Sequence, residues 1–216
     1  GSMLGGGVTK ENRFRTRYPR LLSRAMPENA PAPPLPPAPQ AGRPAPGARN
    51  IVLVGFMATG KTTLGKLLAR RCGFRFIDCD REICRLAGKS IPQIFAQDGE
   101  DRFRALETEV LRGLAGVERA VVATGGGVVL RAENHRLLQE MGFVVWLHTR
   151  KQIILDRVRR NPHRPLLKTP DPLATIRALV KERKPLYRSV ADLKVKTSDL
   201  TTREAVGGIL DSASWF

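Results

Sequence analysis

Gly55-Phe56-Met57-Ala58-Thr59-Gly60-Lys61-Thr62 is the stretch that decides the fold of this chain. It follows the apolar run Ile51–Val54 and opens a segment with helical periodicity, which gives the order strand, glycine-rich loop, helix. In that order, a G-x-x-x-x-G-K-[ST] pattern directs backbone N–H groups of the loop and of the helix N-terminus toward phosphate oxygens. An ordinary glycine-rich turn is the alternative. We predict that the chain binds a nucleoside triphosphate here.

Two side chains of this loop carry chemistry as well as geometry. Lys61 supplies a cation for the β and γ phosphates, and the Thr62 hydroxyl is placed to bind Mg²⁺. We expect the triphosphate to be bound by Gly55, Ala58, Thr59, Gly60, Lys61, Thr62 and Thr63.

The composition fits one main domain in a chain of 216 residues, which is long enough for its own core. The cysteines, Cys72, Cys79 and Cys84, form no C-x-x-C pair, so we interpret them as reduced packing residues of a cytoplasmic protein. No apolar run approaches the roughly 18 residues of a membrane span, so we expect no membrane partner.

The formal net charge of +17 raises the question of a nucleic-acid partner. Eight basic and two acidic side chains lie in residues 1–49, which leaves +11 for residues 50–216. A domain that handles a triphosphate and an acidic substrate needs concentrated arginine and lysine for that purpose. Aromatic residues are only 6% of the chain, too few for an RNA-stacking platform, and we expect no nucleic-acid partner.

Residues 1–49 read as a disordered basic and proline-rich extension before a domain at 50–216. Residues 1–3 (Gly-Ser-Met) are interpreted as a cloning remnant, and the proline-dense stretch 30–47 favours an extended, solvated spacer. A transit peptide and a partner-docking segment are the alternatives, although serine is nearly absent.

Strand and helix signals alternate from residue 50 onward, which predicts an α/β fold with a doubly wound, five-stranded parallel sheet flanked by helices. Apolar runs predict strands at Ile51–Val54, Arg75–Ile77, Ala120–Ala123, Phe143–Leu147 and Lys194–Lys196. Helical periodicity predicts helices at Thr62–Cys72, Arg81–Ala87, Asp101–Ala115, Ala132–Glu140, Gln152–Arg159, Pro172–Tyr187 and Thr202–Asp211.

Acidic residues follow the second predicted strand, at the edge of the sheet where the phosphate loop lies. Asp78 and Asp80, spaced i and i+2, point the same way if the segment is extended. One carboxylate can support Mg²⁺ and the other can orient or deprotonate an acceptor hydroxyl. The alternative is that Asp80 caps a helix beginning at Arg81.

Three further segments are candidates for ligand contacts. Thr124-Gly125-Gly126-Gly127 ends the third strand with exposed backbone donors, or is only a flexible turn. Arg104 has Glu107 at i+3 to hold its guanidinium, although such a pair is more often a solvated one. Residues 160–171 form a predicted loop between helices, able to close as a lid that brings Arg164 to the transferring phosphoryl.

Taken together and in this order, the motifs resemble the shikimate kinases, small P-loop kinases of the nucleoside-monophosphate-kinase fold. The motifs are the P-loop, D-x-D, Phe103-Arg104, Gly-Gly-Gly, Arg164-Pro-Leu-Leu and Arg183-x-x-Leu-Tyr187, and the likeness runs from about residue 50 to 212. The resemblance implies ATP- and Mg²⁺-dependent phosphorylation of the shikimate 3-hydroxyl, a step toward chorismate and the aromatic amino acids.

The resemblance also implies roles for individual residues. Asp80 holds the substrate hydroxyls and acts as base, and Asp78 supports the Mg²⁺ shell bound by Thr62. Arg104 and Arg183 clamp the shikimate carboxylate, because bidentate guanidinium pairing fixes charge and orientation together. The remaining roles fall to Gly126 and Gly127 as N–H donors to shikimate, Lys61 and Arg164 as phosphate-binding catalytic residues, and Arg157 as the side chain that packs on adenine.

Two positions depart from the pattern of the family, which more often has a third glycine at Ala58 and serine at Thr62. Threonine keeps the hydroxyl, whereas alanine tolerates less readily the backbone angle that glycine accepts. We therefore expect weaker nucleotide affinity without loss of a catalytic group.

Three alternatives to an active shikimate kinase are a related kinase acting on gluconate or another hydroxy acid, a nucleotide- or nucleic-acid-binding regulator, and an inactive relative. A regulator need not retain Asp80, Arg104 and Arg183 together, and all three are present. We expect a monomer, since one chain can complete the site.

Overall fold

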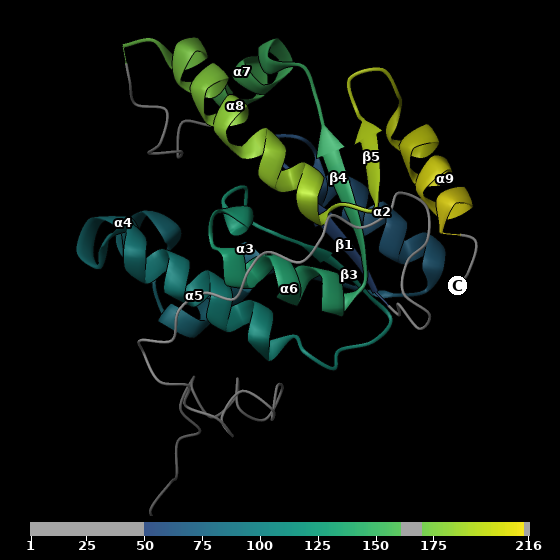
Figure 1. The fold of residues 1–216 in the computed structure, drawn as a ribbon, viewed down its shortest axis with the longest axis horizontal. Helices are drawn as coiled ribbons and strands as arrows, with labels where there is room; N and C mark the ends of the chain where they lie inside the picture. Colours follow the sequence, from purple (N-terminus) through teal and green to yellow (C-terminus); the bar gives the residue numbers. More distant parts are fainter. Residues whose placement is uncertain (1–49, 161–169, 214–216) are drawn as a thin grey trace, which may run out of the picture.

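The computed structural model describes residues 50–160 and 170–213, which form a five-stranded parallel sheet between two layers of helices (Figure 1). The strands are β1 (Asn50–Val54), β2 (Arg75–Asp78), β3 (Ala120–Ala123), β4 (Phe143–His148) and β5 (Leu193–Lys196), in the spatial order β2-β3-β1-β4-β5. The predicted α/β class and all five predicted strands are confirmed.

The central strands are hydrophobic on both faces because helices cover both sides of the sheet. Val52 and Val54 face one layer, formed by α3 (Cys79–Ala87), α4 (Ile91–Gln97), α5 (Gly99–Gly113), α6 (Ala132–Met141) and α8 (Pro172–Val190). Ile51 and Leu53 face the other layer, formed by α2 (Lys61–Cys72) and α9 (Thr202–Ser212). The remaining elements are α7 (Lys151–Arg159), packed against α8 near the phosphate loop, and the short helix η2 (Val128–Leu130).

The structure adds one α-helix that the periodicity did not predict. Helix α4 begins with a capping box in which Ser90 and Gln93 satisfy each other's backbone N–H groups, and a proline lies in its first turn. The signal S-x-x-Q was present in the sequence, but the helix is only seven residues long and buries a single side chain, Ile94. Periodicity is weak evidence over so short a segment.

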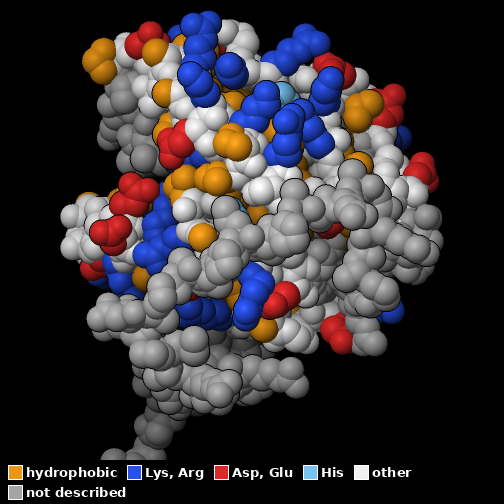
Figure 2. All heavy atoms as spheres, viewed as in Figure 1, with side chains coloured by type: hydrophobic (Ala, Val, Ile, Leu, Met, Phe, Trp, Pro, Cys, Tyr) orange, Lys and Arg blue, Asp and Glu red, His pale blue; other side chains and the backbone are white. Residues whose placement is uncertain are grey.

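Basic side chains gather on the face formed by α8 and the ends of β4 and β5 (Figure 2). These side chains include Lys184, Lys194 and Lys196. Burial, together with the positive charge of these lysines, lowers the pKa of His148.

In the described part of the chain, no helix is long and apolar enough to cross a membrane. The three cysteines are free thiols, as predicted.

Asn50 ties the start of β1 to two neighbouring segments. Its side-chain amide donates to the backbone carbonyls of Val117 (2.6 Å) and Met141 (2.8 Å), and its Oδ1 accepts from Ala120 N–H (3.0 Å). The side chain is buried, so these three backbone groups depend on it for hydrogen bonding. Asn50 therefore fixes the end of the sheet opposite to the phosphate loop.

Replacing Asn50 by alanine tests that role. Asn50→Ala leaves three buried backbone groups unpaired and is expected to lower the free energy of unfolding by about 2–4 kcal/mol, measured by urea denaturation. The exposed helical change Gln152→Ala should cost less than about 0.5 kcal/mol as a control. A loss below about 1 kcal/mol for Asn50→Ala would contradict the bridging role.

Candidate active site

Backbone carbonyls of the loop between β1 and α2 bind the amine of Lys61. Lys61 Nζ donates to the carbonyls of Gly55 (2.7 Å) and Phe56 (2.8 Å), and Thr59 Oγ1 donates to Phe56 O (2.8 Å). Gly60 precedes the helix at φ 96°, a left-handed conformation that glycine adopts without strain. The loop is thus shaped around the place where the predicted phosphates would lie.

Ala58 occupies a left-handed backbone conformation, with φ 60°. This is the backbone angle, more readily accepted by glycine, that the family pattern predicted at this position, and the prediction is confirmed. Arg157 reaches across from α7 and donates from Nη1 to Ala58 O (2.8 Å), which helps to hold the strained residue in place. Because alanine in this region costs about 1 kcal/mol or more relative to glycine, the loop stores strain.

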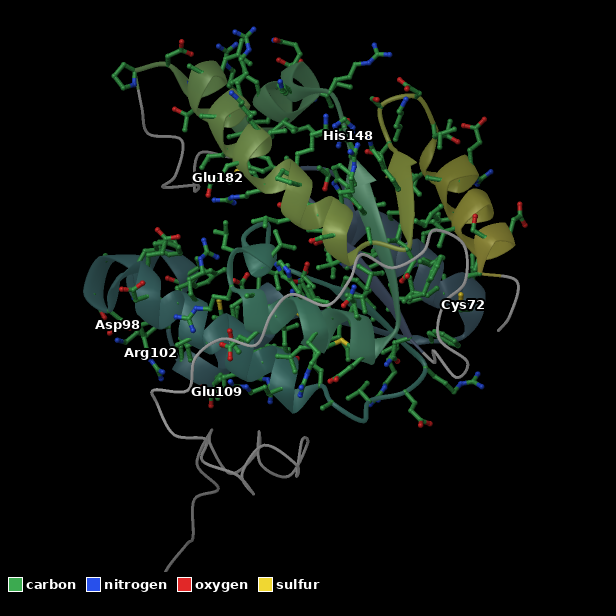
Figure 3. All side chains as sticks on the ribbon, viewed as in Figure 1. Cys72, Asp98, Arg102, Glu109, His148 and Glu182 are labelled. Carbon is green, nitrogen blue, oxygen red and sulfur yellow. The ribbon has the colours of Figure 1, made fainter. Side chains whose placement is uncertain are left out.

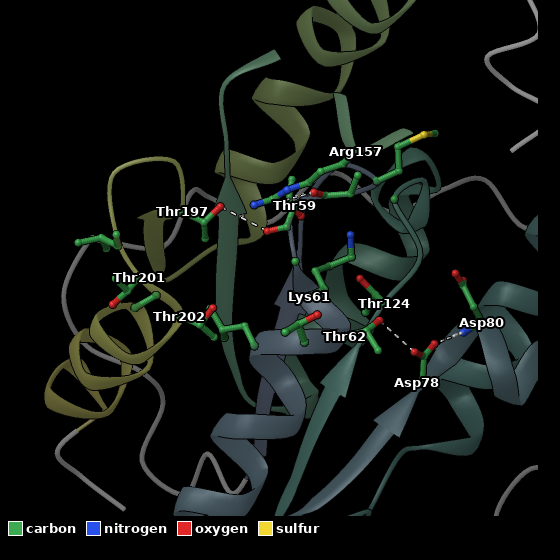
Figure 4. Close-up of a pocket in the computed structure, with 18 residues that line it drawn as sticks. Thr59, Lys61, Thr62, Asp78, Asp80, Thr124, Arg157, Thr197, Thr201 and Thr202 are labelled. Carbon is green, nitrogen blue, oxygen red and sulfur yellow. Dashed lines mark hydrogen bonds between the residues drawn. The ribbon is translucent and has the colours of Figure 1, made fainter. Parts of the chain in front are cut away.

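A cleft of about 490 Å³ opens beside this loop (Figure 4), within the size range of small-molecule sites. It contains most of the predicted nucleotide site together with Asp78, Asp80 and Gly126. The opposite wall of the cleft is formed by residues that were not predicted from the sequence. One of them, Thr197, donates from Oγ1 to Thr59 O (3.3 Å). The wall residues are Thr197, Leu200, Thr201, Thr202 and Ala205.

The two predicted carboxylates line the cleft, but they do not lie on one extended segment as the sequence predicted. Asp78 ends β2, whereas Asp80 lies in the first turn of α3, so the two do not share an extended segment. The helix cap is Asp78, whose side chain accepts from Asp80 N–H (3.2 Å), and the alternative of Asp80 as cap is wrong. Strand β2 ends one residue later than predicted, and α3 begins two residues earlier.

Thr62 and Asp78 provide adjacent oxygen atoms next to the phosphate loop. Thr62 Oγ1 donates to Asp78 Oδ2 at 3.2 Å. Hydroxyl and carboxylate oxygens suit Mg²⁺, which keeps several waters and takes few protein ligands when it also binds phosphates. No cluster of three or more His, Cys, Asp or Glu that could hold a metal occurs among the described residues, so any metal here would rely on such a minimal set.

Arg104 is buried on the inner side of α5 between two carboxylates. It donates from Nη1 to Glu107 Oε2 (3.0 Å) and from Nη2 to Glu100 Oε1 (2.8 Å), whereas Arg102 and Glu109 of the same helix lie on its outer side (Figure 3). The predicted Arg104–Glu107 pair is therefore confirmed as a buried pair rather than a solvated one. Burial raises the pKa of Glu107 to about 7, against the opposing effect of Arg104.

The Gly125–Gly127 turn lies between the phosphate loop and the two arginines. A Cβ at Gly127 would lie 2.2 Å from Arg104 Nη1, and a Cβ at Gly125 would lie 2.5 Å from Glu107 Oε1. Arg183, buried on α8, donates to Gly126 O at 3.2 Å. A Cβ at Gly125 or Gly127 would displace a buried charged side chain, and one at Gly126 would lie 3.1 Å from Met57 N of the phosphate loop, which explains glycine at these positions.

The structure thus brings together the phosphate loop, both aspartates, both predicted carboxylate-binding arginines and the glycine turn. Arg157 lines the cleft, although its contact with adenine stays a prediction. Arg164 lies outside the described residues, as do residues 1–49 and the rest of the predicted lid at 161–169.

The part of the chain that carries these residues is similar to known proteins. The family model described as shikimate kinase matches residues 57–214. The chain belongs to the shikimate kinase family. A shikimate kinase of Hahella chejuensis is 44% identical over 162 residues, covering 75% of this chain and 84% of its own length. That of Geobacter sulfurreducens is 48% identical over 158 residues, covering 73% and 87%.

Solved structures agree with this family. The shikimate kinase from Acinetobacter baumannii in complex with shikimate has a TM-score of 0.74 at 42% identity, covering 78% of this chain and 94% of that one. A gluconokinase from Sinorhizobium meliloti covers 80% of this chain and 94% of its own, with a TM-score of 0.54, but it is only 21% identical and shares the fold alone.

Replacing Ala58 by glycine should relieve the strain in the phosphate loop. We expect Ala58→Gly to raise the free energy of unfolding by about 0.5–1 kcal/mol in urea denaturation, because glycine adopts φ 60° freely. The same substitution at Ala178, exposed within α8, should lower it by about 1 kcal/mol. If both variants lose stability equally, Ala58 is not strained.

Proposed function

We propose that this chain transfers the γ-phosphoryl group of ATP to the 3-hydroxyl of shikimate, giving shikimate 3-phosphate and ADP, a step of aromatic amino-acid biosynthesis. The observation that carries this proposal is the pair of buried arginines, Arg104 and Arg183, beside Asp80 and the phosphate loop. Membership of the shikimate kinase family supports it.

Recognition of the acid follows from the two guanidinium groups. Arg104 and Arg183 come from different helices and meet at the glycine turn, where Arg183 donates to Gly126 O and Arg104 packs against Gly127. A substrate carboxylate between them would form charge-assisted hydrogen bonds in a site with little competing water. That contact fixes the ring, so that an acceptor hydroxyl can lie between Asp80 and the phosphate loop.

Catalysis then rests on positioning and charge. Asp80 accepts the proton of the attacking hydroxyl, and Lys61 contacts the β and γ phosphates once they occupy the loop. Thr62 and Asp78 would hold Mg²⁺, which would neutralise negative charge on the phosphates. We assign further phosphate contacts to Arg164 and an adenine contact to Arg157, and we expect a cytoplasmic monomer.

The direct test is an ADP-release assay with Mg-ATP and shikimate, gluconate or no acceptor in parallel. Turnover that depends on shikimate, and exceeds both controls by at least about tenfold, is the expected result. Equal turnover with gluconate would favour the other hydroxy-acid kinase, and no acceptor-dependent turnover in protein that binds ATP would favour an inactive or regulatory relative.

Removing the charge of Asp80 tests its role as base. Asp80→Asn should lower kcat by about a hundredfold or more and change the Kd for Mg-ATP less than about twofold, because general-base catalysis contributes at that scale. Asp211→Asn, on the exposed end of α9, is the matched control and should behave as the wild type. Unchanged turnover in Asp80→Asn would remove this residue from the mechanism.

A further inference from the structure

The carbonyl of Gly126 is held by two side chains from one helix. Tyr187 donates its hydroxyl hydrogen to Gly126 O, and Arg183, one turn earlier on α8, donates from Nη1 to the same oxygen at 3.2 Å. Both side chains are buried, at 2% and 4% exposure. A single backbone oxygen therefore accepts from both groups, and one of them is a proposed substrate ligand.

Tyr187 is itself rigidly held. Its ring stacks on Trp146 of β4 with 5.8 Å between centroids and an interplanar angle of 24°, and it lies in the core with Val190. Its only polar atom is the hydroxyl that contacts the glycine turn. Burial raises the pKa of this phenol, so the hydroxyl keeps its proton and remains a donor.

Holding the Gly126 carbonyl also orients the next N–H group. A trans peptide is planar, with its C=O and N–H pointing in opposite directions, so the direction of Gly126 O determines the direction of Gly127 N–H. No acceptor for the N–H groups of Gly126 and Gly127 is found among residues 50–160 and 170–213. Arg104 lies against Gly127 on the side of the proposed carboxylate site.

Arg183 alone is a poor anchor for this peptide. Its Nε is buried without a hydrogen-bond partner in the described structure, and its guanidinium lies over the Phe56 ring at 5.7 Å from the centroid. A carboxylate bound through Nη1 of Arg183 would compete with Gly126 O for that donor. Tyr187, whose hydroxyl also contacts the Arg183 side chain, can hold the peptide while Arg183 turns to the substrate.

We propose that Tyr187 is a positioning residue for acid recognition: its hydroxyl locks the Gly126–Gly127 peptide, so that Gly127 N–H points to the bound carboxylic acid and Arg183 is free to bind it. This inference rests on the proposed function, since the acid is shikimate. It predicts an effect on the acceptor rather than on the nucleotide, because the phosphate loop makes no hydrogen bond to Tyr187 in the described structure.

Tyr187→Phe removes the hydroxyl and keeps the ring. We expect the KM and the calorimetric Kd for shikimate to rise about fivefold to tenfold, which is the loss of one hydrogen bond, with the KM for ATP within twofold. The matched control is Ser189→Ala, which removes another hydroxyl of α8 that donates to a backbone carbonyl, Leu186 O. It should leave both KM values within twofold.

A second measurement does not depend on activity or on shikimate. In the assigned amide NMR spectrum of the free protein, the Gly127 N–H signal should shift in Tyr187→Phe and stay in place in Ser189→Ala, because only the former alters the carbonyl of its peptide. A folded Tyr187→Phe protein with wild-type shikimate affinity and an unmoved Gly127 signal would overturn the proposal. Failure of the wild type to bind or phosphorylate shikimate would instead overturn the proposed function, and the NMR comparison would still decide whether Tyr187 sets the peptide.

Discussion

Parallel pairing of β2, β3 and β1 is the constraint on which the site depends. In a parallel sheet all strands end at the same edge, so the segments after three neighbouring strands must meet there. The phosphate loop follows β1, the glycine turn follows β3, and Asp78 and Asp80 lie at the end of β2. Three segments far apart in the sequence thereby form one cleft.

Helices α5 and α8 place buried charged side chains, Arg104, Glu107 and Arg183, at this edge of the sheet. A buried charge is stable only when it is paired. Arg104 is compensated by Glu107 and Glu100, but Glu107 Oε1 and Arg183 Nε have no hydrogen-bond partner in the described structure. Unsatisfied buried polar groups are costly, and they are expected where a ligand supplies the missing partner. A substrate carboxylate beside Arg183 would supply the acceptor that its Nε lacks, whereas Glu107 Oε1, itself an acceptor, would need a donor.

The sequence was sufficient to predict the features that depend on local order. The strand–loop–helix pattern predicted the nucleotide loop, the positive φ of Ala58 followed from the glycine expected there, and the i, i+3 spacing predicted the Arg104–Glu107 pair. Each of these needs only neighbouring residues and the geometry of one element.

Features that depend on distant contacts could not be predicted in this way. Asn50 bonds to carbonyls 67 and 91 residues away, and Tyr187 reaches a carbonyl 61 residues away, so their roles arise only from the strand order. The cleft wall at Thr197–Thr202 carries no motif. The alternative in which Asp80 caps α3 named the wrong aspartate because β2 and α3 adjoin without a loop, and element boundaries are the part of a pattern that is hardest to predict.

The central claim is that two buried arginines recognise a carboxylate, and calorimetry with shikimate and its methyl ester tests it most directly. The ester keeps the ring and hydroxyls but carries no charge. We expect shikimate to bind at least about a hundredfold more tightly than the ester, since charge-assisted bidentate pairing is lost in the ester. Equal affinity for the two compounds would show that Arg104 and Arg183 have no part in recognising the acid.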